Sequence, residues 1–334
     1  MTRKRSWPRY LVRTMLRFAF LMLAVSAVVF LLVGASPIDP VQANTGQAAL
    51  LSMSVAKRAQ IASRWGFGVP IWQRYLSWLV AALHGDFGLS LRYNAPVVDV
   101  VADRFMSSFV LMLSAWIISG LLGVVLGIVS GVRRGTWADA LIKGYSYVLS
   151  ATPSFWLALV MLMVFAVQLR WFPMGFSYGI GKSTASVSIA ERAYHLVLPA
   201  LTLSITGVAN IALHTREKVI DVMDTDYVRF ARTRGESDVR IVLRHGLRNL
   251  LMPAITLQCA SIGEIFGGSV LVEQVFSYPG LGQAAVTAGL GGDAPLLVGI
   301  ALASAALVFA GNGIANILYG VLDPQMREGA VHVE

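Results

Sequence analysis

The sequence has few charged residues and a single cysteine. Asp, Glu, Lys and Arg make up 13% of its 334 residues and hydrophobic residues make up 56%, whereas an average soluble domain is about 25% charged and about 45–50% apolar. Because the surface of a soluble domain needs polar cover, it has no room to bury so many apolar side chains. The composition excludes an ordinary cytosolic enzyme, a disordered chain and a collagen-like chain. With Cys259 alone, the chain forms no intrachain disulfide and no metal site built from cysteines.

Patterns of catalytic and metal-binding residues are also missing. The five histidines are scattered and no two have the spacing of metal ligands on one helix: His84, His195, His214, His245 and His332. An intramembrane enzyme would need paired acids or His–Glu clusters inside its apolar segments. Glu264 is the one acid well inside such a segment, and it has no acidic partner. No local signature of a catalytic nucleophile appears, so we expect this chain not to be an enzyme and to hold no metal.

One segment resembles a nucleotide site only superficially. Gly175-Phe-Ser-Tyr-Gly-Ile-Gly-Lys-Ser183 ends like a phosphate-binding loop. That loop requires a glycine five positions before the glycine of its Gly-Lys-Ser end, and this position is Phe176. No strand is expected before the segment. We therefore expect no cofactor in this chain.

What the chain does contain is long apolar runs. A crossing of the bilayer's hydrocarbon core takes about 20 apolar residues. We predict six transmembrane helices, near 11–34, 105–132, 140–168, 195–214, 250–275 and 295–322. A basic leader precedes the first run, so a cleaved signal peptide is an alternative there. We favour an uncleaved helix because the run is longer than a typical signal-peptide core and because more spans follow.

The segment between the first two spans is different in composition. Residues 36–104 mix charges, Gly, Pro and aromatics without a sustained apolar run, which predicts a loop or small cap outside the bilayer. Within it, 75–83 reads as an amphipathic helix in the cap or along the interface. The expected organisation is a tail and first helix (1–35), this extracytoplasmic segment (36–104), a five-helix core (105–327) with a cytoplasmic loop at 215–249, and a tail (328–334).

The net charge of +9 is concentrated in alternate loops. The N-terminal tail, the loop at 133–143 and the loop at 215–249 are rich in Lys and Arg, whereas the opposite short loops hold Lys182 and Arg192 or no basic residue. Short loops that are rich in Lys and Arg lie on the cytoplasmic side of a membrane, so both termini are predicted to be cytoplasmic. The basic charge is thus a topology signal, and we expect no nucleic-acid partner. Gly123, Gly127 and Gly131, four residues apart, predict a close helix–helix contact on the second span.

The loop that starts at Asp226 is the most informative part of the sequence. Asp226-Tyr-Val-Arg-Phe-Ala-Arg-Thr-Arg-Gly235 predicts a short helix ending at the glycine, and Ser237 or Glu236 then opens a second one. Arg240, Arg244 and Arg248 recur every four residues, with Ile241 on the adjacent face. Such a helix suits docking into a partner's groove. A solvated loop that follows the membrane surface fits the spacing equally well.

These residues resemble the signature loop of permease subunits of binding-protein-dependent ABC importers. The match is Asp226-Tyr-Val-Arg-x-Ala-x-x-Arg-Gly235 followed by x-Leu-Arg-x-x-Leu-Arg-Asn-x-Leu-x-Pro253. The dipeptide/oligopeptide/nickel branch is indicated by further matches in order along the chain: Gly85-Asp-Phe-Gly-Leu-Ser90, Thr152-Pro-Ser-Phe-Trp-Leu157, Leu196-Val-Leu-Pro-Ala-Leu-Thr-Leu203, Val272-Glu-Gln-Val-Phe-Ser-Tyr-Pro-Gly-Leu-Gly282 and Leu322-Asp-Pro-Gln-Met-Arg327. There are two departures: 105–111 lacks the family's usual proline and acid, and Asn316 replaces an acid.

The resemblance implies a fold, partners and a mechanism. It implies a type I ABC importer permease in the bacterial inner membrane, with a homologous second permease, two cytoplasmic ATPase subunits that bind ATP and Mg, and an extracytoplasmic solute-binding protein. The loop would be the helix that couples ATPase closure to the spans. The residues carried over to this coupling role are Asp226, Tyr227, Ala231, Gly235, Arg240, Ile241, Arg244, Leu247, Asn249 and Pro253.

The resemblance by itself identifies neither the cargo nor its path. The branch carries dipeptides, oligopeptides, nickel or metal chelates, and glycosides. Glu264 would be costly facing lipid, so we expect it, with Gly268, to face the pathway or a partner subunit. Glu273 is expected to cap or pack at the end of its span. The alternative function is an ion-driven secondary transporter, which would favour several intramembrane acids and an internal repeat; neither is evident.

Overall fold

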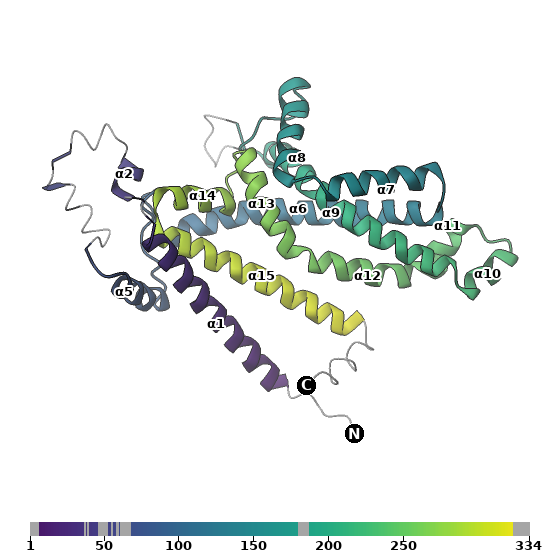
Figure 1. Ribbon diagram of the computed structural model, residues 1–334, viewed down its shortest axis with the longest axis horizontal. Helices are drawn as coiled ribbons and strands as arrows, with labels where there is room; N and C mark the ends of the chain where they lie inside the picture. The colour runs from purple at the N-terminus through teal and green to yellow at the C-terminus, as the bar shows by residue number, and fades with distance from the viewer. Residues whose placement is uncertain are drawn as a thin grey trace. The chain divides into compact units, whose positions relative to one another are not determined.

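The computed structural model describes residues 7–36, 38, 40–45, 53–54, 56–57, 60, 68–179 and 187–322, with side chains except at 7–11, 40–41, 45, 243, 245, 248–253 and 316–322. In these residues all regular structure is helical apart from an isolated bridge between Leu89 and Pro96, which confirms the predicted fold class for the described part. Residues 180–183, the end of the segment that resembles a phosphate-binding loop, and the predicted tail at 328–334 lie outside the described residues. The helices in Figure 1 are α1 Trp7–Gly34, α2 Pro40–Thr45, α5 Ile71–Leu83, α6 Val97–Val132, α7 Trp137–Ser150, α8 Ser154–Met161, the π-helix η1 Leu162–Gln168, α9 Ile189–Met223, α10 Asp226–Thr233, α11 Asp238–Ile241, the π-helix η3 Val242–Gly246, α12 Leu247–Ala260, α13 Ile262–Val275, α14 Leu281–Gly291 and α15 Ala294–Leu322.

Four of these helices are long and apolar enough to cross a bilayer. The qualifying stretches are Val12–Gly34 of α1, Val97–Val132, Ile189–Met223 and Ala294–Ala315 of α15, which match the first, second, fourth and sixth predicted spans. Two further helix pairs qualify only when each pair is counted as one broken span. The described residues therefore hold four to six spans, and the number six stays a prediction.

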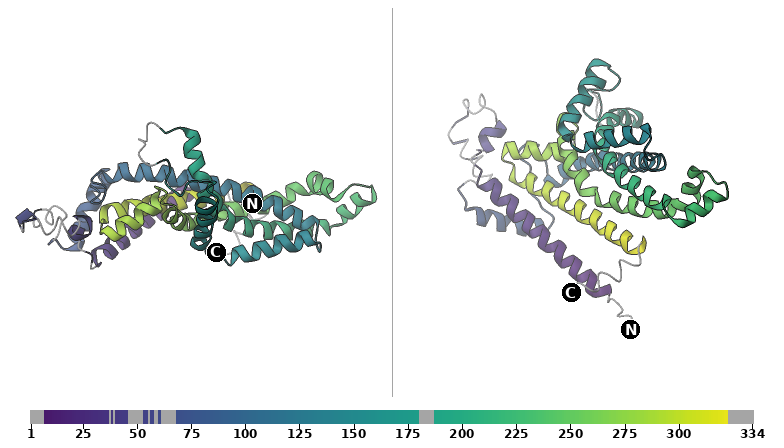
Figure 2. Two further views of the ribbon diagram at one scale, coloured as in Figure 1. Left: turned by 90° about the horizontal axis from the view of Figure 1, so that it is seen from above. Right: turned by 45° about the vertical axis from the view of Figure 1, so that its right-hand side comes forward.

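The third and fifth apolar runs are bent. The pair α7 and α8 with η1 is bent by 109°, and Figures 1 and 2 show α8 turned away from the line of α7; the pair α12 and α13 is bent by 51°. The runs at 140–168 and 250–275 therefore form two helices each, not the single helices that their length indicates. Pro153 explains the sharper bend, because the residue before a proline is driven out of the helical conformation and α8 starts directly after it.

Several boundaries differ from the sequence prediction. Residues 97–104, predicted as part of the extracytoplasmic loop, are the start of α6, and residues 215–223 of the predicted cytoplasmic loop are the end of α9. With 35 residues, α9 is about 52 Å long at 1.5 Å per residue, well beyond a hydrocarbon core of about 30 Å. The helix α14 was not predicted, whereas the helix predicted at 75–83 is confirmed as α5.

The chain divides into two compact units, each described here by itself. Unit 1 comprises the described parts of Met1–Ser107 and Pro279–Phe309. In it, Trp78 of α5 packs with Phe30 of α1 and Val298 of α15 in a buried cluster. The buried Asp293 caps α15 by accepting from Leu296 N at 3.2 Å, and it also accepts from Ser90 Oγ at 2.7 Å. Through its bond to Asp293, Ser90 joins the end of the Gly-Asp-Phe-Gly-Leu-Ser segment to the start of α15.

Unit 2 comprises the described parts of Ser108–Tyr278 and Ala310–Glu334, and glycines bring α6 and α9 into close contact there. A Cβ placed on Gly127 would lie 2.5 Å from Thr215 Cβ and 2.7 Å from the Ala212 carbonyl oxygen. One on Gly131 would lie 2.5 Å from Val219 Cβ. The predicted close helix–helix contact of this glycine face is confirmed, and its partner is α9.

Two polar pairs hold the bent α12–α13 pair along α6. Ser108 donates to the buried Glu273 at 2.6 Å. Nearer the other end of α6, the Trp116 indole donates to the Gln258 carbonyl at 2.7 Å, and the Gln258 side-chain amide donates back to the Trp116 carbonyl. The contacts run in order, with α13 near the start of unit 2's part of α6 and α12 further along.

Candidate functional site

The segment between α9 and α12 is a pair of short helices joined by a tight turn. Gly235 has a φ of +81°, and its N–H donates to the Arg232 carbonyl at 2.9 Å. The helix break predicted at Gly235 is confirmed. Ser237 is the residue that precedes α11, which decides between the two predicted openings. A Cβ at Gly235 would meet no atom within 4 Å, so the backbone conformation alone, rather than packing, favours glycine there.

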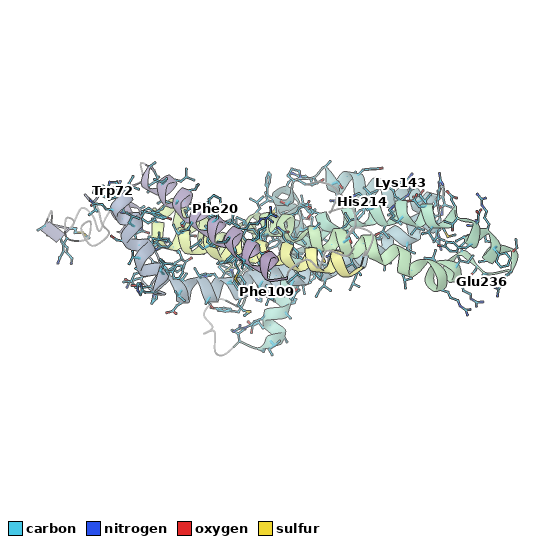
Figure 3. All side chains as sticks on the ribbon, turned by 90° about the horizontal axis from the view of Figure 1, so that it is seen from below. Phe20, Trp72, Phe109, Lys143, His214 and Glu236 are labelled. Atoms are coloured by element: carbon cyan, nitrogen blue, oxygen red, sulfur yellow. The ribbon has the colours of Figure 1, made fainter. Side chains whose placement is uncertain are left out.

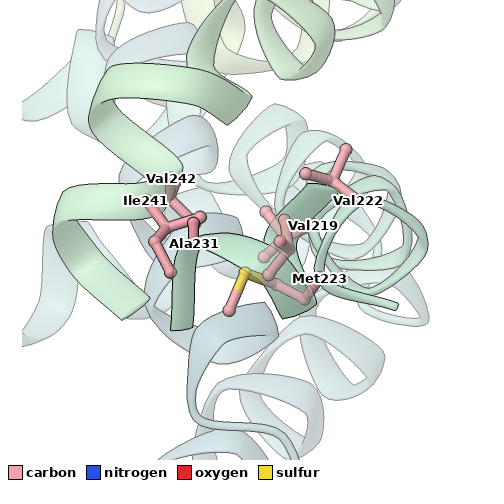
Figure 4. Close-up of a cluster of buried hydrophobic side chains, with 7 residues drawn as sticks. Val219, Val222, Met223, Ala231, Ile241 and Val242 are labelled. Atoms are coloured by element: carbon pink, nitrogen blue, oxygen red, sulfur yellow. The ribbon is translucent and has the colours of Figure 1, made fainter. Parts of the chain in front are cut away.

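This helix pair is packed onto the end of α9 by an apolar cluster. Figure 4 shows the cluster, in which Ala231, Ile241 and Val242 of the pair meet side chains of α9. Its buried members are Val219, Val222, Met223, Val228, Ala231, Ile241 and Val242, with Ile128 and Val132 of α6 packed against them. Ile241 is completely buried. Ile241, which the resemblance assigns to the coupling role, is therefore covered by its own chain and packs inside the segment.

Other side chains of the pair remain uncovered. Tyr227 and Phe230, three positions apart on α10, are 42% and 66% exposed, and Val239 of α11 is 60% exposed. Residues three apart share a helix face. Sequence reasoning missed Phe230 and Val239, since the matched motif leaves these positions open. Figure 3 labels Glu236 at the turn beyond α10.

The charged residues of the pair are also at the surface. Arg232 donates to Asp238 across the turn at 2.8 Å, and Arg229 donates to the exposed Asp226 at 3.3 Å. Arg240 and Arg244 are exposed and Leu247 is half-buried, whereas the side chains of Arg248, Asn249 and Pro253 lie outside the described set. The segment thus exposes aromatic and basic side chains, while its buried apolar side chains pack it onto α9.

The second short helix is continuous with the helix that follows it. α11, η3 and α12 follow one another without a break, so the helix continues to Ala260. η3 is a π-helical stretch between Arg240 and Leu247, and its hydrogen bonds span one residue more than in an α-helix. The predicted common face of Arg240, Arg244 and Arg248 rests on regular α-helical spacing and is interrupted by this turn.

A buried carboxylate beside this segment was not predicted. Asp139, in the first turn of α7, is 1% exposed and accepts from Arg216 of α9 through Nε at 2.6 Å and a terminal nitrogen at 2.9 Å. It also accepts from Ser130 Oγ of α6 at 2.6 Å and from Gly135 N at 3.0 Å. We call these four residues the Asp139 network.

The residues assigned to a pathway lie in different environments. Glu264, in the first turn of α13 directly after the 51° bend, is exposed in this chain. Gly268 faces α9, since a Cβ there would lie 3.1 Å from Leu203 Cδ1. Glu273 is completely buried, as expected for packing at the end of its helix. Burial, together with the Glu273 carboxylate, raises the pKa of Tyr278 to about 12, so this phenol stays protonated.

Among the described residues, no group of three or more His, Cys, Asp or Glu side chains gathers in a way that could hold a metal ion. The arrangement in this part of the chain offers an exposed docking surface and close helix contacts.

Comparison with known families gives two matches. Residues 123–328 match the family described as binding-protein-dependent transport system inner membrane component. Residues 8–112 match the N-terminal family of the same membrane components. Together they take in the apolar helices and the segment around Gly235.

Individual relatives align over nearly the whole chain. The oligopeptide transport system permease protein AppB of Bacillus subtilis is 35% identical over 319 residues, covering 95% of this chain and 99% of the relative. A putative peptide permease protein of Brucella ovis is 34% identical, covering 96% and 99%. The glutathione transport system permease protein GsiC of Escherichia coli K12 is 32% identical, covering 95% and 98%.

Proposed function

Because the chain belongs to the family of binding-protein-dependent transport system inner membrane components, we propose that it forms half of the translocation pathway of an ATP-driven importer in the bacterial inner membrane. It is a permease component of an ABC importer, as its full-length relatives are permeases. The other half of the pathway comes from a homologous second permease. The basic tail and basic loops lie in the cytoplasm, in line with the distribution of Lys and Arg.

The segment 224–246, which we call the coupling segment, docks on a cytoplasmic ATPase subunit. Its support is one observation: the segment is fixed from inside by the buried cluster and exposes Tyr227, Phe230 and several arginines outward. An aromatic side chain surrounded by basic groups fits a pocket with an acidic rim. ATP and Mg bind in the two ATPase subunits, and closure of these subunits moves the docked segment and the helices packed on it.

Peptides are the proposed cargo class, delivered by an extracytoplasmic solute-binding protein. The relatives named for oligopeptide, peptide and glutathione transport support this class. Glu264 is proposed to face the pathway or the second permease, because an exposed acid in an apolar segment is costly against lipid. Uptake of a labelled tripeptide, glutathione and a nickel chelate by the assembled system compares the candidate cargoes directly.

The test is transport by the complete complex in vesicles. We expect uptake that requires ATP and the binding protein and that persists when ion gradients are collapsed by ionophores. Uptake that follows the ion gradient without ATP would favour the secondary transporter instead.

Docking by the coupling segment is tested by co-purification of the ATPase subunits. Phe230→Asp places a charge in the proposed pocket, and Arg244→Glu reverses a charge at its rim; both are expected to weaken co-purification. The effect of Arg244→Glu should depend on salt, because charges at a rim are screened over about 10 Å at 0.1 M. Arg133→Glu is the matched control, since Arg133 is exposed on the α6–α7 turn outside the segment. Equal co-purification by all three variants would contradict docking at this surface.

A further inference from the structure

The Asp139 network joins three helices at one point. Asp139 belongs to α7, Ser130 to α6 and Arg216 to α9, and Gly135 lies in the turn that connects α6 with α7. Arg216 uses two nitrogens on the two carboxylate oxygens, a bidentate arrangement that fixes both distance and orientation. The Asp139 side chain is 1% exposed and that of Arg216 is 16% exposed. The pair is therefore largely shielded from water and salt, unlike an ion pair at the surface.

The last two turns of α9 connect the network with the coupling segment. Arg216 precedes the end of α9 at Met223 by about two helical turns, roughly 10 Å. The intervening turns carry Val219, Val222 and Met223, which pack against Val228, Ala231 and Ile241 of the coupling segment. Between Arg216 and Met223, Val219 of α9 lies against Gly131 of α6. A push on the coupling segment thus reaches α9 and, through Ile128 and Val132, the end of α6. Asp139 then joins α7 to α9.

The apolar contacts set how near the helices approach, since the glycine face of α6 lets α9 come close. A charge-assisted bidentate bond adds a directional restraint, because it also fixes orientation. The bidentate pair between Asp139 and Arg216 supplies such a directional restraint between α7 and α9. Lys143, at 3.8 Å from Asp139, adds a second positive charge on α7 itself and does not link the helices.

We propose that Asp139 and Arg216 are positioning residues for energy coupling: their ion pair makes α6, α7 and α9 move as one body with the coupling segment. This inference rests on the proposed function of that segment. Without the pair, the ATPase subunits still dock and hydrolyse ATP, but movement of α9 is only partly passed to α7. The ratio of cargo imported to ATP hydrolysed then falls.

The test compares three variants in the complete complex, reconstituted with the binding protein and a labelled peptide. Asp139→Asn keeps shape and the acceptor for Ser130 but leaves Arg216 without its carboxylate. Arg216→Lys keeps the charge and loses the bidentate geometry. Asp221→Asn is the matched control, because Asp221 pairs with Lys218 of the same helix, α9, at 3.1 Å while both side chains are more than 50% exposed.

The expected result is a drop in the import-to-hydrolysis ratio of about tenfold or more for Asp139→Asn, the size of a typical coupling between linked sites. Arg216→Lys is expected to give an intermediate ratio and Asp221→Asn the unchanged ratio, with all three retaining the ATPase subunits. A normal ratio in assembled Asp139→Asn complexes would overturn the proposal, also where fewer complexes assemble, since a merely structural pair lowers yield and leaves the ratio unchanged. If the unaltered complex itself fails to import with ATP, the proposed function fails, and that result is separate from any difference among the variants.

Discussion

Gly235 adopts a backbone conformation that most residues accept only at a penalty. Its φ of +81° falls in the left-handed region, where a residue with a Cβ is disfavoured by roughly 1–2 kcal/mol and a β-branched residue by more. The space around the position is open, so substitutions act through the backbone and not through clashes. The turn it forms directs α11 back toward α9, where Ile241 is buried.

Gly235→Val is expected to leave membrane insertion and pairing with the second permease intact while abolishing peptide uptake and loosening the ATPase subunits. Val strains the turn, and the strain is relieved when α10 and α11 shift relative to each other. Gly235→Asn is the control, because Asn tolerates positive φ far better, and it should retain most uptake. Transport in reconstituted vesicles and co-purification measure the two effects. Full transport by Gly235→Val would rule out a coupling role for this turn.

At the scale of helices, the contact of α6 with α9 depends on the absence of side chains. Gly123, Gly127 and Gly131 lie where an added Cβ would come within 2.5 to 2.7 Å of Ile211, Thr215 and Val219. Atoms at such distances must move, so a larger residue forces the helices apart. Gly144 on α7, by contrast, has no atom within 4 Å of its Cβ position.

Gly127→Leu is expected to lower the yield of intact complex severalfold, at a destabilisation of roughly 1–3 kcal/mol or more for overpacking a tight contact. Gly144→Leu introduces the same side chain at an open helical position and should leave the yield unchanged. Size-exclusion profiles of the solubilised complexes give the comparison. Similar yields for both variants would mean that α6 and α9 do not need their close approach.

The sequence allows the long helices to be predicted, because each bilayer crossing needs an apolar run that is visible without knowledge of its neighbours. It does not reveal α14, since Leu281–Gly291 is short and rich in Gly and Ala and has no such run. The break at Gly235 has a local cause and was predictable. Asp139 was not, because its partner Arg216 is 77 positions away and no local motif marks the pair. Likewise, the pattern around Ile241 identifies an apolar face but not whether the chain itself or a partner covers it.

At the scale of the whole molecule, contacts within unit 2 bear on the number of crossings. The α6–α7 turn lies beside the end of α9, through Asp139 with Arg216 and Arg134 with Asp224. If α9 crosses the bilayer, the chain between that turn and the start of α9 must cross as well, so the bent α7–α8 pair counts as a span. The α12–α13 pair similarly runs along α6, from the apolar cluster against which Val132 of α6 packs to Glu273, which accepts from Ser108 of α6. Val132 and Ser108 lie roughly 35 Å apart along that helix.

We therefore predict that reporter fusions after Gly135 and Gly235 report the same compartment, the cytoplasm, and that a fusion after Lys182 reports the opposite one. A re-entrant α7–α8 pair would instead place Gly135 and Lys182 on one side. The two arrangements differ at Gly135 and Lys182, and paired alkaline phosphatase and fluorescent-protein fusions at each site distinguish them. Agreement between the Lys182 and Gly135 fusions would exclude six crossings.

The π-helical turn η3 has a consequence for the direction in which the coupling segment faces. Successive residues of an α-helix are about 100° apart around its axis, and the hydrogen bonds of η3 span one residue more than those of an α-helix. The angular phase of α11 relative to α12 is therefore set by how many residues η3 contains. Because this turn already holds one residue more than α-helical bonding needs, deleting one residue from 242–246 would return it to α-helical bonding with the direction of α11 kept. Deleting two would turn α11 by roughly 100° around the axis of α12 and point a side chain other than Ile241 at α9. At these five positions, chain length is a constraint in its own right, independent of which amino acids occupy them.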